Sequence, residues 1–225
     1  MTTLGSVLPA LWCLTLYERS GSAGLDGVQR LAEGLVAGSL PAVIYLCIYG
    51  MHVGDAGAAA LAAALDRGAL PRLKGLLLYN TAIGDAALAA LAPALRRRPA
   101  LEDLDLGGNP LGDEGLAALV APPPPPAGTP LPPAGGLKQL KSLDLGDTQI
   151  TDAGCATFAA ASHFELIHLE RLLLSLTQVT DAGCATLAAA LDSGALPALE
   201  ELALLGTPAS VAATDAVRQA LAKRK

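Results

Sequence analysis

The residues best suited to chemistry in this chain are carboxylates, which gather in two short stretches. They are Glu102, Asp103, Asp105, Asp144 and Asp147. Carboxylates at such density can hold a metal ion or act as a general acid and base. None of the three histidines lies in register with these carboxylates in the repeats described below. We expect the carboxylates to lie on an open, solvated face, where their pKa values stay ordinary. The sequence therefore predicts no catalytic residue, no metal site and no cofactor, and we do not expect an enzyme.

Four cysteines lack the paired spacing of a zinc site or of a disulfide framework: Cys13, Cys47, Cys155 and Cys184. Reduced thiols of this kind predict a cytoplasmic protein. We expect Cys155 and Cys184 to lie in the core, at one position of consecutive helices and too far apart for a disulfide. We expect Cys13 and Cys47 to be more exposed, with Cys47 the more reactive of the two.

The composition indicates a folded chain with few bulky core residues. Of its 225 residues, 52% are hydrophobic and only 3% are aromatic, which favours many thin layers built from leucine, alanine and valine. The formal net charge of -6 disfavours nucleic acid and anionic membranes as partners and favours a basic protein surface. The sequence contains no apolar stretch of about 18 residues, the length that spans a bilayer.

A repeated phrase organises the chain that positions these residues. The stretch 148–160 reads TQITDAGCATFAA, and 177–189 reads TQVTDAGCATLAA. Alignment of every copy gives seven units, which begin near Leu11, Val43, Leu73, Leu101, Leu140, Leu169 and Leu199. Such a period predicts stacked supersecondary units rather than one globular core.

Each unit predicts one strand, one turn and one helix. It opens with the pattern L-x-x-L-x-L, as at Leu101, Leu104 and Leu106, whose alternation is typical of a strand. An acid then recurs at one equivalent position: Asp55, Asp85, Asp113, Asp152 and Asp181. We expect these acids to meet the positive end of the helix that follows, with the preceding Gly or Thr as an acceptable cap.

Stacking these units predicts an α/β fold, a right-handed solenoid of about seven repeats that spans 1–225 as a single domain. Strands about 4.8 Å apart and helices about 8–10 Å apart force the stack to curve, with the parallel sheet on the concave face and the helices on the convex face. A proline-rich insert at 121–136 interrupts the fourth repeat. It is either a ligand for a proline-recognising groove or a tolerated low-complexity expansion.

The pattern L-x-x-L-x-L-x-x-(N/T)-x-(I/L)-(G/T)-D-x-G resembles the ribonuclease-inhibitor-like class of leucine-rich repeats. The same repeat type occurs in the activating protein of the Ran GTPase and in nucleotide-binding innate immune receptors, so the resemblance implies a binding protein without naming its partner. This chain departs from the pattern because only Asn109 carries the usual asparagine after the strand, with threonine at most other copies. A threonine hydroxyl can still satisfy a loop backbone group, but the ladder should be less uniform.

In this geometry, three of the four tyrosines fall in one concave column, Tyr17, Tyr49 and Tyr79, with Tyr45 beside them. Tyrosine is enriched at binding hot spots, so this column is a candidate anchor for a partner. The alternative is that cross-strand aromatics only stabilise the sheet. The next column contains Leu77, Asp105 and Asp144, and with Asp103 and Asp147 it gives a field that suits a basic partner.

Arg96, Arg97 and Arg98 end a helix, where cations complement the helix dipole. The other interpretation is a guanidinium finger that acts on a GTPase. We therefore predict a protein-interaction scaffold that binds a macromolecular partner on the concave sheet, or alternatively a regulator of a small GTPase resembling the Ran activator. A third hypothesis is a self-associating structural piece.

Overall fold

Strands and helices alternate along the computed structural model, which describes residues 10–17, 27–35, 39–120, 137–161 and 166–224. The strands are β1 (Cys13–Tyr17), β2 (Tyr45–Tyr49), β3 (Gly75–Leu77), β4 (Asp103–Asp105), β5 (Ser142–Asp144), β6 (Arg171–Leu173) and β7 (Glu201–Ala203). The helices are α2 (Gly27–Gly34), α3 (Gly54–Asp66), α4 (Asp85–Arg96), α5 (Asp113–Val120), α6 (Asp152–Ala161), α7 (Asp181–Asp192) and α8 (Val211–Ala222). Each repeat therefore contains the strand and the helix that its sequence predicts.

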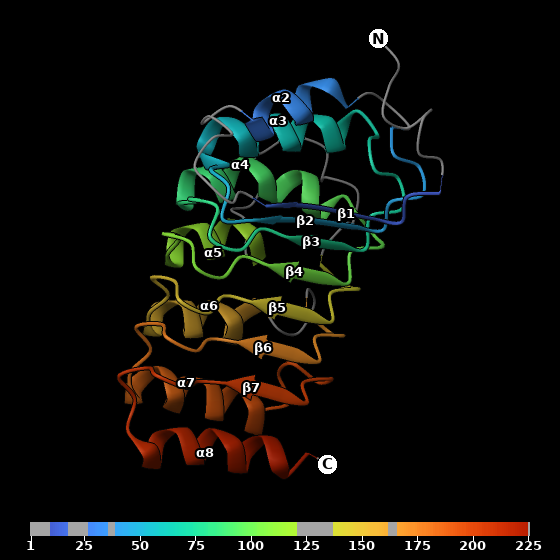
Figure 1. Cartoon of the computed structure of the whole chain (residues 1–225). Helices are drawn as coiled ribbons and strands as arrows, with labels where there is room; N and C mark the ends of the chain where they lie inside the picture. The colour runs from blue at the N-terminus through green and yellow to red at the C-terminus, as the bar shows by residue number, and fades with distance from the viewer. Residues whose placement is uncertain (1–9, 18–26, 36–38, 121–136, 162–165, 225) are drawn as a thin grey trace, which may run out of the picture.

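The strands form one parallel sheet in which each strand pairs with the next one in the sequence. Equivalent leucines lie side by side, so that Leu104 on β4 pairs with Leu76 on β3 and with Leu143 on β5. Figure 1 shows the strands and helices stacked in chain order from one end of the molecule to the other. The predicted α/β solenoid of about seven repeats is confirmed.

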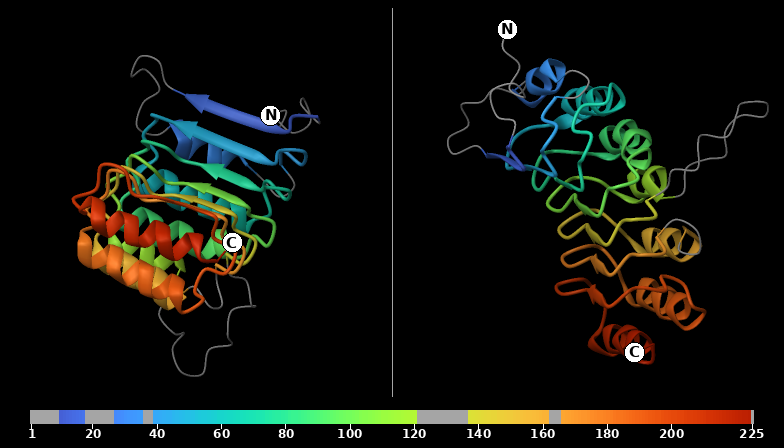
Figure 2. Two further views of the ribbon diagram at one scale, coloured as in Figure 1. Left: turned by 90° about the horizontal axis from the view of Figure 1, so that it is seen from below. Right: turned by 90° about the vertical axis from the view of Figure 1, so that its right-hand side faces the viewer.

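The core lies between the sheet and the helices. The strand leucines that point inward are fully buried, as are the leucines of the facing helices, for example Leu76 and Leu104 against Leu88 and Leu116. Burial of one such side chain contributes about 1.5–3 kcal/mol. The second view of Figure 2 shows the helices along the outer side of a curved stack and the strands along its inner side. The wider spacing of helices than of strands explains this curvature.

The turns after the strands are held by buried polar side chains, as predicted. Asn109 Oδ1 accepts from Thr81 N at 2.9 Å and from Ile83 N at 3.0 Å, and Asn109 Nδ2 donates to Leu78 O at 2.7 Å and Leu106 O at 2.8 Å. Asn109 therefore links two repeats. Thr148 and Thr177 only donate to carbonyls three residues earlier in their own repeats. The ladder is less uniform because a hydroxyl is shorter than an amide.

The recurring acids lie in the first turn of their helices, and most of them also reach the next repeat. Asp152 Oδ1 accepts from Thr180 N at 2.8 Å and from Gly183 N at 2.9 Å, at the start of α7. Asp85, Asp113 and Asp181 make equivalent bonds to the following repeat. A carboxylate at a helix N-terminus satisfies free N–H groups, so these acids also hold consecutive repeats together.

The predicted proline-rich insert at 121–136 lies outside the described residues, between the end of α5 and Leu137. The hypotheses about that insert stay predictions. None of the helices in the described part of the chain is long and apolar enough to span a membrane.

Candidate functional site

The concave face is made by the strand residues that alternate with the buried leucines. Tyr17 on β1 pairs with Tyr49 on β2, and Cys47 pairs with Leu77 on β3. Tyr79 follows Leu77 by two residues and its carbonyl accepts from Gly50 N at 3.0 Å, which continues the same pairing one step past the strand. The structure therefore brings the three column tyrosines onto adjacent strands of one face.

The three column tyrosines differ in their exposure to solvent. Tyr17 is 62% exposed and Tyr79 is 45% exposed, whereas Tyr49 between them is half-buried. Burial and the neighbouring Cys47 thiol raise the pKa of Tyr49 to about 12. The Tyr79 ring lies over Gly107 and Gly108, since a Cβ at either glycine would stand 3.2 Å from the ring. The column thus presents two accessible rings with a more enclosed one between them.

Tyr45 belongs to a different arrangement, a polar bridge across five strands. Its ring passes over Gly75, and its hydroxyl donates to Asp103 Oδ2 at 3.0 Å. Arg171 on β6 approaches the other oxygen of the same carboxylate, with Nη2–Oδ1 at 3.7 Å. The bridge spans β2 to β6 because the residues it crosses on β3 and β5, Gly75 and Ser142, are small. Tyr45 and Asp103 are therefore already partnered within the chain.

Glu102 is also neutralised within the chain. Its carboxylate binds Lys74 Nζ at 2.7 Å and Lys141 Nζ at 3.0 Å, one lysine from each neighbouring repeat. Hydrogen bonds from Lys74 and then Lys141 lower the pKa of Glu102. Among the strand acids on this face, Asp105, Asp144 and Glu201 have no cationic partner in the described structure.

Asp105 and Asp144 pair directly across β4 and β5. Each carboxylate accepts a hydrogen bond from a backbone N–H two residues later, from Gly107 at 2.9 Å and from Gly146 at 2.8 Å. Burial is the main cause that raises the pKa of Asp105, and repulsion from Asp144 adds to it. The hydrogen bond from Gly107 acts in the opposite direction but is outweighed. The expectation of ordinary pKa values was therefore wrong for Asp105, because neighbouring side chains reduce its solvation and the charge of Asp144 repels its ionised form.

Asp147 lies outside the strands, in the turn after β5. Its backbone has a φ of 54° and its side chain is exposed, while its N–H donates to Ser175 O at 2.8 Å. Leu77 is half-buried between Cys47 and Asp105 in the central column. Within the described residues, no group of three His, Cys, Asp or Glu side chains could hold a metal ion.

Comparisons with known proteins agree with this architecture. A family model described as leucine-rich repeat matches residues 99–120, 138–159 and 165–188. These segments coincide with the strand, turn and helix of consecutive repeats in the structure. The chain is a leucine-rich-repeat protein. A search of curated protein sequences finds none that matches it.

Two solved structures show how this leucine-rich-repeat fold compares in three dimensions. The actin-binding site 2 of leiomodin-1 superposes with a TM-score of 0.54 at 16% identity, over 75% of this chain and 88% of that one. Internalin C2 from Listeria monocytogenes gives a TM-score of 0.50 at 21% identity, over 94% of this chain and 79% of that one. At these identities the likeness concerns the fold alone.

The cysteines of the leucine-rich-repeat protein are all free. Cys155 and Cys184 are buried, as predicted, and burial raises the pKa of both thiols, that of Cys155 to about 12. The prediction for Cys47 was wrong: it is only 7% exposed, and Cys13 is the more accessible thiol. Thr15 and Leu77 flank Cys47 on the adjacent strands, and burial is the main cause that raises its pKa.

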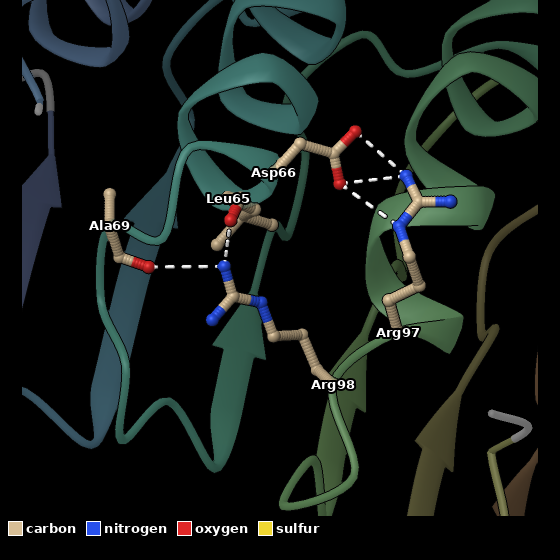
Figure 3. A network of polar contacts seen from close by, with 5 residues as sticks. All are labelled: Leu65, Asp66, Ala69, Arg97 and Arg98. Carbon is tan, nitrogen blue, oxygen red and sulfur yellow. Dashed lines mark hydrogen bonds and ion pairs between the residues drawn. The ribbon is translucent and has the colours of Figure 1, made fainter. Parts of the chain in front are cut away.

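The arginines after α4 tie two repeats together, as Figure 3 shows. Arg97 binds both oxygens of Asp66, with Nη2 at 2.7 Å from each. Arg98 donates to the carbonyls of Leu65 and Ala69 at the C-terminal end of α3. The role predicted at a helix C-terminus thus holds for Arg98, but at α3 rather than at α4, the helix that these arginines end. A guanidinium finger would need to be mobile and free, whereas both of these side chains are engaged.

Sequence reasoning missed the partners of the acids on the concave side. Lys74, Glu102 and Lys141 hold one position, just before the strand, in three consecutive repeats, so their alternating charge was a readable signal. The reach of Arg171 to Asp103 had no such signal because the two residues lie two strands apart. Two exposed leucines at the far end of the sheet, Leu176 after β6 and Leu205 after β7, were also not singled out.

Proposed function

We propose that this leucine-rich-repeat protein binds a protein partner on the concave face of its sheet and is not an enzyme. Leucine-rich-repeat proteins generally act as protein-interaction scaffolds. The leiomodin-1 structure, whose title names an actin-binding site, is one example among the similar folds. The observation that carries the proposal is the column of Tyr17, Tyr49 and Tyr79. Its two exposed rings, Tyr17 and Tyr79, lie on one face of the sheet on either side of the half-buried Tyr49, and exposed aromatic side chains gathered on one face are typical of a binding site.

The acids refine the partner that we propose. Glu102 and Asp103 are neutralised by lysines and an arginine of this chain, so they do not set the charge that a partner meets. Asp105 and Asp144 remain beside the tyrosine column and favour a basic group on the partner. A partner segment with apolar side chains for the tyrosines and a lysine or arginine for this pair would match the surface.

Two finer assignments belong to the same proposal. The strand, turn and helix of each repeat, with Thr or Asn in the turn, support the ribonuclease-inhibitor-like class. The four free cysteines support a reducing, cytoplasmic location.

Site-specific photocrosslinking tests the binding face. A photoreactive residue at Thr15, exposed in the concave central column, should capture a discrete partner from lysate, and one at Ala89, exposed on helix α4, should not. The captured protein is then purified and its affinity measured by calorimetry. Tyr17→Ala and Tyr79→Ala should each weaken binding about tenfold, the typical effect of losing a hot-spot tyrosine.

The matched control is Leu205→Ala, which removes an exposed apolar side chain far from the tyrosines. It should leave the affinity unchanged. If the tyrosine variants bind as tightly as the parent protein and only their unfolding temperature falls, the aromatic column is structural and the proposal is wrong.

A further inference from the structure

The last described strand and helix, β7 and α8, form an apolar surface that nothing in the described chain covers. A shallow groove there is lined by Leu202, Leu204, Thr214, Val217, Arg218 and Leu221. Leu202 and Leu204 are partly exposed, whereas the equivalent Leu172 and Leu174 of the preceding repeat are fully buried. Leu205 and Val211, 81% and 75% exposed, extend the same end. Exposed apolar groups gathered in this way mark an interaction surface.

The edge of β7 also offers backbone hydrogen bonds. The carbonyls of Ala203 and Leu205 accept from Leu174 and Leu176 on the β6 side. Because successive residues of a strand point their N–H and C=O groups to opposite sides, those of Leu202 and Leu204 point to the open edge. An edge of this kind is a template for pairing with another strand.

The outer side of the last described repeat differs from that of the inner repeats in two side chains. In the inner repeats, an aspartate such as Asp152 or Asp181 caps the N-terminus of the next helix. The equivalent residue in the last described repeat is Val211, whose side chain has no hydrogen-bond acceptor. Arg218 stands where the preceding repeat has Ala188, a small side chain that packs against the core, so a stacked repeat would meet a guanidinium there.

We propose that this end is the interface of a two-fold symmetric dimer in which β7 pairs antiparallel with β7 of a second copy. In this dimer the free N–H and C=O groups of Leu202 in each copy bond to those of Leu204 in the other copy. This register places Ala203 on the two-fold axis. The exposed leucines then cover one another, and the small Ala203 side chains meet where strands approach most closely. Glu201 faces Leu205 of the second copy, so the two Glu201 carboxylates stay apart.

The charges on α8 are complementary to themselves under this symmetry. Asp215 and Arg218 are 48% and 70% exposed in their side chains and form an ion pair within the helix at 2.6 Å. Two α8 helices related by the axis run antiparallel side by side, which sets the aspartate of one copy opposite the arginine of the other. Such self-complementarity is what a two-fold interface requires.

The first test is the mass of the intact chain by light scattering over a wide concentration series. The proposal expects a reversible rise from the mass of one chain to twice that mass. A mass of one chain at every concentration overturns it. Species that keep growing beyond two chains indicate head-to-tail stacking and overturn it as well. Tyr17→Ala and Tyr79→Ala should dimerise normally, so this result is independent of partner binding on the concave face.

Cysteine crosslinking tests the register. Under mild oxidation, Ala203→Cys should give a covalent dimer that a reducing agent reverses, because a residue on the axis meets its own copy. Glu201→Cys, two residues away on the same face, is the matched control and should not crosslink beyond the level of the parent protein. Crosslinking of Glu201→Cys in place of Ala203→Cys overturns the proposed pairing.

Charge exchange tests the helix contact. Asp215→Arg and Arg218→Asp should each weaken dimerisation about tenfold, because both symmetric contacts turn from attraction to repulsion. The double variant restores opposite charges and should recover the dimer. Circular dichroism establishes that each variant is folded. If the double variant is as weak as the single ones, α8 does not form the contact and the proposed interface is wrong.

Discussion

The hydroxyl of Tyr45 donates to the carboxylate of Asp103 at 3.0 Å from two strands away, with the phenol ring over the strand between them. The contact exists because Gly75, on the intervening strand, has no side chain. It ties a residue of the aromatic end of the concave face to the acidic strands beside it. The hydrogen bond to Asp103 is also the main cause that raises the pKa of Tyr45.

Replacing Gly75 by alanine should break this bridge. The new Cβ would overlap the Tyr45 ring, so the ring must move and the bond to Asp103 is lost. We expect a loss of about 1–3 kcal/mol in the free energy of unfolding, measured with urea, as for other overpacking changes. Tyr45→Phe keeps the ring, so it should cost only about 0.5–1.5 kcal/mol. An equal loss in both variants would show that the hydroxyl, rather than the packing of the ring, determines the effect.

Much of the fold was predictable because the chain repeats itself. The copies at 148–160 and 177–189 define the period, and the period places equivalent leucines on adjacent strands. The same alignment predicted that Tyr17 and Tyr49 are neighbours, which the strand pairing shows. Repeats give positions reliably because a stacked unit has only one way to bury its leucines.

The direction and surroundings of single side chains were less predictable. Cys47 was expected to be exposed from its strand position, but its flanking residues cover it. Asp105 was expected to titrate normally, yet burial and Asp144 shift its pKa upward. These properties depend on the sizes and rotamers of neighbours in other repeats, which a pattern within one repeat does not contain.

Asn109→Ala should be among the most damaging single polar substitutions. It leaves buried N–H groups of Thr81 and Ile83 without the acceptor that they now share. Each buried group left unsatisfied costs about 1–3 kcal/mol, and we expect a total loss of about 3 kcal/mol in urea unfolding. Thr177→Ala, which loses one hydroxyl bond within its own repeat, is the control and should cost about 1 kcal/mol. Similar losses in the two variants would argue against an inter-repeat role for Asn109.

Asp152→Ala should weaken the junction between the repeats of α6 and α7. Burial alone would raise the pKa of Asp152, but hydrogen bonds from Thr180 and Gly183 outweigh it and lower the pKa. A carboxylate whose pKa is lowered by folding stabilises the folded state at pH values above its ordinary pKa. This stabilisation is lost as the pH falls through the pKa of the folded state. The variant should therefore lose about 0.5–2 kcal/mol at neutral pH, with the difference from the parent protein shrinking in acid.

Asp55→Ala is the matched control for Asp152→Ala, because no hydrogen bond from the next repeat to Asp55 is seen in the described structure. Its effect should stay within about 0.5 kcal/mol, as for surface substitutions generally. Thermal unfolding across an acid pH series measures both variants. A difference for Asp152→Ala that stays constant through the acid range would mean that its carboxylate does not carry the effect.

Alkaline titration should reveal Tyr49 when every variant carries Tyr45→Phe, because the pKa of Tyr45 is also raised. Burial and the Cys47 thiol raise the pKa of Tyr49 to about 12, so its phenolate should form late in an absorbance titration. Tyr49→Phe should remove that late step. A tyrosine whose pKa is raised by folding stabilises the folded state at pH values below its ordinary pKa near 10. This stabilisation is lost as the pH rises through the pKa of the folded state. A titration whose late step survives in Tyr49→Phe would assign it to another residue.

The variant Arg98→Ala distinguishes a structural role of this arginine from a catalytic one. The Arg98 guanidinium donates to the carbonyls of Leu65 and Ala69, so Arg98→Ala leaves the C-terminal end of α3 without these donors. We expect a loss of about 1–2 kcal/mol in urea unfolding, within the range for leaving a buried carbonyl without its partner. Arg96→Ala, the neighbouring control, should stay within about 0.5 kcal/mol.

Nucleotide hydrolysis by small GTPases should be the same with or without the parent protein. Acceleration that Arg98→Ala abolishes while the protein stays folded would instead establish a GTPase activator that acts through this arginine.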